Sequence, residues 1–333
     1  MKTFKKFIYW FLGIVALLVI VSFLLPKNYK VERSVTIASK TSLLYTLTSN
    51  FELWHVWVPW TREADSSAVF TIQGEPGKVG TSWEWEGKVF GNGRMVLTET
   101  TPGQGIAYDL AFDHGKYQSK GRIILESRAD SVKVSWLDEG NLGWSPINRY
   151  FGLFMDRMMG PDFEKGLAKL KTIAEARRDW PAVDETVYPE RKVIMVTDSA
   201  GPKDYGSVMA RAFGELYGFL QSHKLKPDGD AFATYLRWDS VTYFSVMNIC
   251  VPVAGEVAGA GRVRFATIPE TRYARAVYFG DYAKIEPAYR ALEIYIKEAG
   301  RTEIGGPSEL YKTSPVIEKD TAKWETHVLF PIR

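Results

Sequence analysis

Cysteine and histidine are scarce in this chain of 333 residues. The single cysteine, Cys250, excludes an internal disulfide framework and any site built from several cysteines. The four histidines, His55, His114, His223 and His327, are scattered and show no spacing typical of metal ligands. We therefore expect neither a disulfide nor a bound metal.

The chain also lacks a marked excess of charge of either sign. Lysine and arginine number 42 against 39 acidic residues, so the basic surface typical of a nucleic-acid-binding protein is not indicated. Phosphate-binding loops, dinucleotide fingerprints and Ser-His-Asp spacing are missing as well. We expect no cofactor and no nucleic-acid partner. What remains is a folded chain, 46% hydrophobic and 24% charged, long enough for two domains.

One long apolar run lies near the N-terminus. Residues 7–25 carry no charge, and a run of this length is enough for a helix to cross a bilayer. The run continues into Pro26 without a small-residue cleavage site, which favours an uncleaved anchor over the alternative, a signal peptide. We therefore predict a single-pass transmembrane helix in segment 1–28. The flanking charges favour a cytoplasmic N-terminus and extracytoplasmic globular domains.

Residues 29–178 have the pattern of an antiparallel sheet followed by one long helix. Alternating apolar and polar residues begin at 29–37 and recur up to residue 137, between turns rich in glycine and proline. The pattern then turns helical over 147–178, with Gly160-Pro161 expected to interrupt the helix. An apolar stripe with spacings of four, three and four residues covers one face of that helix: Phe163, Leu167, Leu170 and Ala174.

Tryptophans are concentrated in this first region. Wide, polar-tipped rings in such numbers suggest the wall of a cavity, although any one of them could equally be a core residue. The rings that we expect at the cavity are Trp57, Trp60, Trp83 and Trp85.

Four motifs characterise the same region: Trp57-Val-Pro-Trp60, Glu75-Pro-Gly-Lys-Val-Gly80, Gly91-Asn-Gly-Arg-Met95 and Asp162-Phe-Glu-Lys-Gly-Leu167. On these motifs the region resembles the START-like (SRPBCC), polyketide cyclase/dehydrase and lipid-transport superfamily. The resemblance implies a helix-grip fold, with a cavity between a curved sheet and the C-terminal helix. It implies no particular ligand, because members of the superfamily bind very different molecules.

The last part of the chain contains an internal repeat. Residues 179–189 hold two prolines and no periodicity, and we interpret them as a linker. Within 190–333, two helical stripes begin at Met209 and Ile285, 76 residues apart. Each is preceded by a strand-like segment, 192–197 or 262–268, and followed by an extended segment with a tyrosine, Tyr235 or Tyr311. The region is therefore predicted to be a duplicated strand-helix-strand-strand unit in an α+β chain.

Three further motifs lie in this region: Ile268-Pro-Glu-Thr-Arg-Tyr273, Tyr278-Phe-Gly280-Asp-Tyr282 and Glu309-Leu-Tyr311. On them it resembles the GyrI-like small-molecule-binding domain, also found as the effector-binding domain of multidrug-responsive regulators. The resemblance implies an acid on the last strand that faces a cationic ligand. Here the matching pair is Thr326-His327, and Glu325 lies one residue before that pair. This departs from the Thr-Glu pattern of many relatives.

A second ligand site is expected around Glu309. Glu309 and Tyr311 are two residues apart on a predicted strand, so their side chains point to one face. An acid among aromatic rings suits a cationic or amphipathic ligand, while the alternative is a surface acid beside a structural tyrosine. The expected site consists of Tyr235, Trp238, Tyr278, Glu309, Tyr311, Trp324 and His327.

The leading hypothesis is a membrane-anchored protein that binds apolar or amphipathic small molecules, as a sensor, scavenger or carrier. Each globular domain would offer one pocket for a hydrophobic or cationic small molecule. The alternative is an enzyme, a hydrolase or a cyclase/dehydratase, with Glu309 as acid or base and with Tyr311 and His327 orienting it. A third class is an interaction module that uses the sheet faces.

Overall fold

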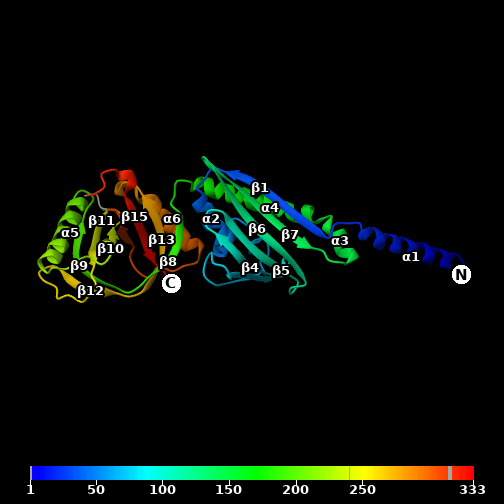
Figure 1. Cartoon of the computed structure of the whole chain (residues 1–333), viewed down its shortest axis with the longest axis horizontal. Helices are drawn as coiled ribbons and strands as arrows, with labels where there is room; N and C mark the ends of the chain where they lie inside the picture. The colour runs from blue at the N-terminus through cyan, green and yellow to red at the C-terminus, as the bar shows by residue number, and fades with distance from the viewer. Residues whose placement is uncertain (1, 240, 314–316) are drawn as a thin grey trace. The chain divides into compact units, whose positions relative to one another are not determined.

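The computed structural model describes residues 2–239, 241–313 and 317–333 (Figure 1). The chain forms two compact units, Met1–Arg178 and Asp179–Arg333. Each unit is built on one antiparallel sheet, so the predicted α+β class with two sheet domains is confirmed.

The N-terminal helix α1 (Lys2–Ser22) differs from the predicted anchor. The helix ends at Ser22, so its share of the apolar run is roughly 24 Å long at 1.5 Å per residue, against a hydrocarbon core of about 30 Å. Within the described part of the chain, no helix combines the length and the apolar character needed to cross a membrane. The predicted transmembrane helix over 7–25 is therefore wrong, and with it the single-pass localisation and its orientation.

Helix α3 (Pro146–Gly152) holds the C-terminal end of α1. The buried guanidinium of Arg149 donates to the carbonyl oxygens of Ser22 and Phe23, at 3.3 and 3.1 Å. The hydroxyl of Tyr150 donates to the carbonyl oxygen of Leu18 at 2.8 Å. The carbonyl of Ser22 lies in the last turn of α1, where carbonyls have no intrahelical partner.

The first unit is a seven-stranded antiparallel meander covered by a long helix. Its strands follow the order β1-β7-β6-β5-β4-β3-β2. Their bounds are β1 (Asn28–Ile37), β2 (Val69–Gln73), β3 (Ser82–Gly87), β4 (Gly91–Thr101), β5 (Gly105–Phe112), β6 (Tyr117–Arg128) and β7 (Ser131–Asn141). The helices on this sheet are α2 (Thr41–Ser49), the 3-10 helix η1 (Phe51–Val56) and α4 (Met155–Ala176).

Helix α4 packs against β1 and β7. The predicted stripe Phe163, Leu167, Leu170 and Ala174 is its buried face, and the ring of Phe163 stacks on Trp136 with centroids 4.2 Å apart. The helical region breaks at Leu153 and Phe154, whereas Pro161 lies inside α4. The interruption that we predicted at Gly160-Pro161 is therefore wrong.

The second unit contains an eight-stranded sheet in the order β12-β9-β11-β10-β14-β15-β13-β8. Helices α5 (Tyr205–Ser222) and α6 (Glu286–Glu298) pack on this sheet (Figure 1). The strand bounds are β8 (Val183–Tyr188), β9 (Arg191–Ala200), β10 (Phe232–Asp239), β11 (Phe244–Pro252), β12 (Arg264–Ile268), β13 (Thr271–Phe279), β14 (Ser308–Tyr311) and β15 (Glu325–Pro331). Two short 3-10 helices, η2 (Tyr282–Lys284) and η3 (Thr321–Lys323), complete the unit.

The duplication is visible in the strand order. The series β9-α5-β10-β11 is repeated as β13-α6-β14-β15, and the halves meet where β10 pairs with β14. The predicted first strand of the second copy, 262–268, corresponds to β12, whereas the strand that precedes α6 is β13. The edge strands are exchanged, because β8 pairs with β13 and β12 pairs with β9. Strand β8 lies within 179–189, the range that we interpreted as a linker.

Candidate ligand-binding sites

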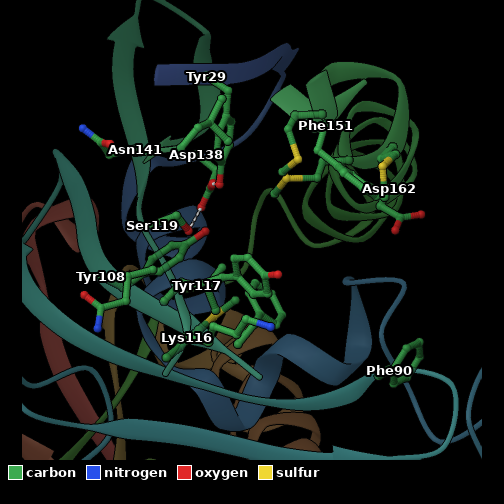
Figure 2. A pocket seen from close by; sticks show the side chains of 18 of the residues that line it. Tyr29, Phe90, Tyr108, Lys116, Tyr117, Ser119, Asp138, Asn141, Phe151 and Asp162 are labelled. Atoms are coloured by element: carbon green, nitrogen blue, oxygen red, sulfur yellow. Dashed lines mark hydrogen bonds between the residues drawn. The ribbon is translucent and has the colours of Figure 1, made fainter. Parts of the chain in front are cut away.

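The first unit contains a partly open cavity of about 750 Å³ between its sheet and helices α3 and α4 (Figure 2). This volume falls within the range of about 300–1,000 Å³ usual for small-molecule pockets. Most of the lining is aromatic or aliphatic. The cavity can therefore accommodate an apolar molecule of drug size.

Three of the four tryptophans expected at this cavity line it. Trp60, Trp83 and Trp85 belong to the wall, and the indole N–H of Trp60 donates to Asp162 of α4 at 3.2 Å. The fourth, Trp57, is fully buried outside the lining, and its N–H donates to the carbonyl oxygen of Leu47 at 3.0 Å. Trp57 thus braces the core behind the wall.

The helical side of the cavity is rich in methionine. Helix α4 contributes Met155, Met158 and Met159, and α3 contributes Ile147 and Phe151. Methionine side chains are unbranched and polarisable, so they adapt to ligands of different outline. This wall favours a broad range of apolar shapes over one fixed shape.

One end of the cavity is polar. Figure 2 shows Asp138 of β7 beside Ser119 of β6, with Tyr29 of β1 above them. The hydroxyl of Tyr29 donates to one carboxylate oxygen of Asp138 at 2.9 Å, and that of Ser119 donates to the other at 3.0 Å. Asp138 itself is completely buried. We call these three residues the Asp138 triad.

Two glycines make room for the rings around this triad. A Cβ atom at Gly140 would come within 2.5 Å of the Tyr29 ring, and one at Gly121 within 1.9 Å of the Tyr108 ring. Glycine at these strand positions therefore lets both rings lie flat across neighbouring strands. The hydroxyl of Tyr108 accepts the indole N–H of Trp136 at 2.8 Å.

Burial sets the protonation of this group. Loss of solvation raises the pKa of Asp138 to about 6, although the hydrogen bonds from Tyr29 and Ser119 act in the opposite direction. Sequence reasoning missed Asp138. The available signal was its position, because it follows Val132, Val134 and Trp136 at period two on the inward face of β7.

The second unit contains a buried acid surrounded by tyrosines. Glu309 of β14 is 6% exposed and lies opposite Ala233 of β10, where the two repeats meet. One carboxylate oxygen accepts the hydroxyl of Tyr289 from α6 at 2.6 Å, and the other accepts that of Tyr311 at 3.0 Å. We use the name Glu309 cluster for Glu309 and its four tyrosines, Tyr205, Tyr235, Tyr289 and Tyr311.

The remaining members of the Glu309 cluster come from the first repeat. Tyr205 at the start of α5 is hydrogen-bonded through its hydroxyl to Tyr235 of β10. Burial raises the pKa of Glu309, against the hydrogen bonds from Tyr289 and Tyr311. The pKa of Tyr205 is also raised above its usual value, mainly by burial and secondly by the nearby charge of Glu309. The tyrosines therefore stay protonated and act as donors toward the acid.

The other residues expected at this site lie at different distances from Glu309. The ring of Trp324 packs on Tyr282 with centroids 4.9 Å apart, and Tyr282 packs in turn on Tyr311 at 5.7 Å. Tyr278 lies on β13, two strands from β14, and its hydroxyl donates to the carbonyl oxygen of Asp281. Trp238 is 54% exposed.

His327 lies on the opposite face of the sheet from Glu309. It pairs with Leu310 across β14 and β15, whereas Glu309 pairs with Val328, so their side chains alternate. Its Nε2 atom is 2.7 Å from a carboxylate oxygen of Glu325. The site expected from the sequence did not include Tyr205, Tyr282 or Tyr289. Tyr289 lies on the amphipathic stripe of α6, which identified it only as a packing residue.

Comparison with known proteins gives two family matches. The family described as polyketide cyclase/dehydrase and lipid transport matches residues 28–175, and the GyrI-like small molecule binding domain matches residues 182–333. No curated protein matches the chain.

Solved structures similar to the chain include the EcmrR–DNA complex, with 18% identity, a TM-score of 0.46, and coverage of 56% of this chain and 70% of that chain. A hydrolase from Listeria innocua has 13% identity and a TM-score of 0.37, with 45% of this chain and 91% of that chain covered. SAV2435 bound to tetraphenylphosphonium has 12% identity and a TM-score of 0.32, with 45% and 93% covered. The absence of a nucleic-acid partner stays a prediction.

Both predicted family resemblances are confirmed by the family matches, and both families are of small-molecule-binding types. The chain thus contains a polyketide cyclase/dehydrase and lipid-transport domain at residues 28–175 and, after it, a GyrI-like small-molecule-binding domain at residues 182–333.

Proposed function

We propose that this protein binds amphipathic small molecules, with one site in each unit, and serves as their sensor, scavenger or carrier. The observation that carries the proposal is the cavity of about 750 Å³ in the first unit. A cavity of this size with an apolar wall and few polar groups is the usual form of a small-molecule site. The first site accordingly takes ligands with a large apolar body.

The Glu309 cluster supports a second site with a preference for cations. A buried carboxylate without a counter-charge is costly, and the hydroxyls of Tyr289 and Tyr311 offset only part of that cost. A ligand cation supplies the missing charge, and the surrounding rings add cation–π attraction. The pairing of Glu309 with Ala233 puts the acid on one side of the repeat junction. The site is therefore asymmetric, and a ligand that carries its charge at one end fits it best.

The test of the first site uses N-phenyl-1-naphthylamine, a neutral probe whose emission rises in apolar surroundings. We expect saturable emission with the full chain and several-fold weaker binding by Trp60→Phe, which removes the indole donor to Asp162 but keeps an aromatic ring. Trp144→Phe is the matched control, because Trp144 is 71% exposed and lies outside the lining. A wild-type chain that shows no saturable emission would refute a binding role for this cavity.

The second site is tested with benzyltrimethylammonium and neopentylbenzene, which have the same shape and differ in charge. Glu309→Gln should weaken binding of the cation at least about tenfold and leave the neutral compound within about twofold, since one ion–ion contact is lost. Glu293→Gln is the control, because Glu293 is an exposed acid on α6. An equal loss for both compounds would contradict the assignment of Glu309 as the cation partner.

A second candidate function is an enzyme that acts on a hydrophobic small molecule. The observation in its favour is the raised pKa of Glu309, which suits a general acid or base working near neutral pH. Tyr311, which donates to Glu309, is the residue that would orient it, whereas His327 faces the other side of the sheet. Turnover of a hydrophobic ester or epoxide that survives Glu309→Gln would reject this role.

A further inference from the structure

The Asp138 triad contains a buried carboxyl without a counter-ion. Asp138 is 0% exposed, and its partners in the structure are the neutral hydroxyls of Tyr29 and Ser119. In the described part of the chain no lysine, arginine or histidine forms an ion pair with it. A buried charge is expensive unless it is paired. An asparagine would accept from one hydroxyl and donate to the other without that cost, so the acid is not explained by packing alone.

The charged groups around the cavity do not compensate for this acid. Only Lys116, Asp138 and Asp162 are charged among the lining residues. The ammonium of Lys116 is 3.4 Å from Asp113, and its side chain is 65% exposed. Asp162 comes from α4 on the far side, where Trp60 donates to it. Glu139 follows Asp138 on β7 and is an exposed residue. The cavity is therefore electronegative in sum.

The hydroxyl of Tyr29 connects the buried acid with the cavity. Its proton is directed to Asp138, so the lone pairs of its oxygen are left to accept from another donor. Tyr29 lines the cavity and is only partly buried, in contrast to Asp138 behind it. Burial keeps the pKa of Tyr29 above its usual value, so it remains a phenol. A ligand that meets this oxygen must donate a hydrogen bond.

Aromatic rings flank the same spot. The rings of Tyr29 and Tyr108 both line the cavity, in the spaces that Gly140 and Gly121 leave free. The faces of such rings attract cations, which adds to the attraction exerted by the carboxylate. Beyond them the wall becomes apolar, with Trp83 and Met95 among its residues. The polar and apolar parts of the cavity are therefore separate.

We propose that the Asp138 triad recognises the protonated nitrogen of an amphipathic amine, which donates to the Tyr29 hydroxyl with Asp138 as counter-charge behind it, while its apolar body fills the cavity. This inference rests on the proposed function, since it assigns a ligand class to the cavity in the first unit. It concerns a site separate from the Glu309 cluster, which lies in the other unit.

The experiment compares 1-naphthylmethylamine with 1-naphthalenemethanol by calorimetric titration at pH 8. The two probes share one aromatic body and one donor position, and they differ in charge. All variants carry Glu309→Gln, so that the second unit contributes equally to each. On this background, Asp138→Asn removes the charge but keeps groups that pair with both hydroxyls. Asp109→Asn is the matched control, because Asp109 is an exposed acid on β5 of the same sheet.

We expect the parent protein to bind the amine about tenfold or more tightly than the alcohol, as a charge-assisted hydrogen bond requires. Asp138→Asn should abolish this preference by weakening the amine alone, and Asp109→Asn should preserve it. Tyr29→Phe should weaken both probes, because both donate to the same oxygen.

Two results overturn the inference, and they are distinguishable. If the parent binds both probes equally well, or Asp138→Asn weakens both equally, the cavity binds ligands but Asp138 does not select their charge. If the parent binds neither probe, the cavity does not take ligands of this size, and the proposed function of the first unit falls together with the amine proposal.

Discussion

Replacing Asp138 by asparagine should stabilise the protein at neutral and alkaline pH. Burial raises the pKa of Asp138 from 3.8 to about 6, so the folded state binds this proton more tightly than the unfolded state does. The stability that comes from the protonated acid is fully present below pH 4 and is lost as the pH rises through about 6. A shift of about two pKa units corresponds to about 3 kcal/mol above pH 7.

The asparagine variant does not titrate and therefore avoids this loss. Its free energy of unfolding should exceed that of the wild type by up to about 3 kcal/mol at pH 8, and the two should converge near pH 4. For a unit of this size the difference at pH 8 corresponds to roughly 6–12 °C in melting temperature. Asp109→Asn, which changes an exposed acid, should give a small difference without this pH profile.

Tryptophan emission during thermal unfolding is a suitable assay for this comparison. All tryptophans except Trp180, Trp238 and Trp324 belong to the first unit, so the signal reports mainly on the unit that carries Asp138. A loss of stability in Asp138→Asn that is equal at pH 4.5 and pH 8 would refute the reasoning. Such a result would mean that the carboxyl is needed for packing and that its charge does not lower the stability of the fold.

Three further outcomes are expected. Amine binding by the first unit should weaken as the pH falls below about 6, because Asp138 then takes up a proton. Titration of 1-naphthylmethylamine at several pH values tests this, and an affinity that does not change with pH would contradict it. Glu309→Gln should lower the affinity for benzyltrimethylammonium at least about tenfold while Glu293→Gln does not, as compared by calorimetry. Gly121→Ala should lower the melting temperature, since its Cβ would meet the Tyr108 ring at 1.9 Å, and an unchanged melting curve would show that the ring moves at little cost.

The general plan of the chain could be predicted from local patterns. The stripe from Phe163 to Ala174 gave the buried face of α4, because helical periodicity is a property of neighbouring turns. The repeated tyrosines, Tyr235 and Tyr311, indicated the extended segments that form β10 and β14. The exchange of β8 and β12 between the repeats could not be predicted, since pairing between strands distant in sequence leaves no local pattern.

The errors have physical causes as well. The apolar run 7–25 predicted a spanning helix, but the length of a helix depends on where it ends, and Arg149 binds the carbonyls at that end from a distant part of the chain. His327 was expected near Glu309 because it matches the position of the ligand-facing acid on the last strand of GyrI-like relatives. The register of β14 and β15 places the two side chains on opposite faces, and register depends on tertiary pairing.

Asp138 and Glu309 illustrate what distinguishes the two candidate sites from ordinary cores. Each is an acid on an inward strand position, each is hydrogen-bonded to hydroxyl groups, and burial raises the pKa of each. Acids in such positions lower stability unless a cation or a proton joins them. The two acids lie in domains of different families and share no sequence motif. If both acids take a cationic ligand, as we propose, the two units bind the same chemical class of molecule, and the paired Asp138→Asn and Glu309→Gln variants separate the contribution of each.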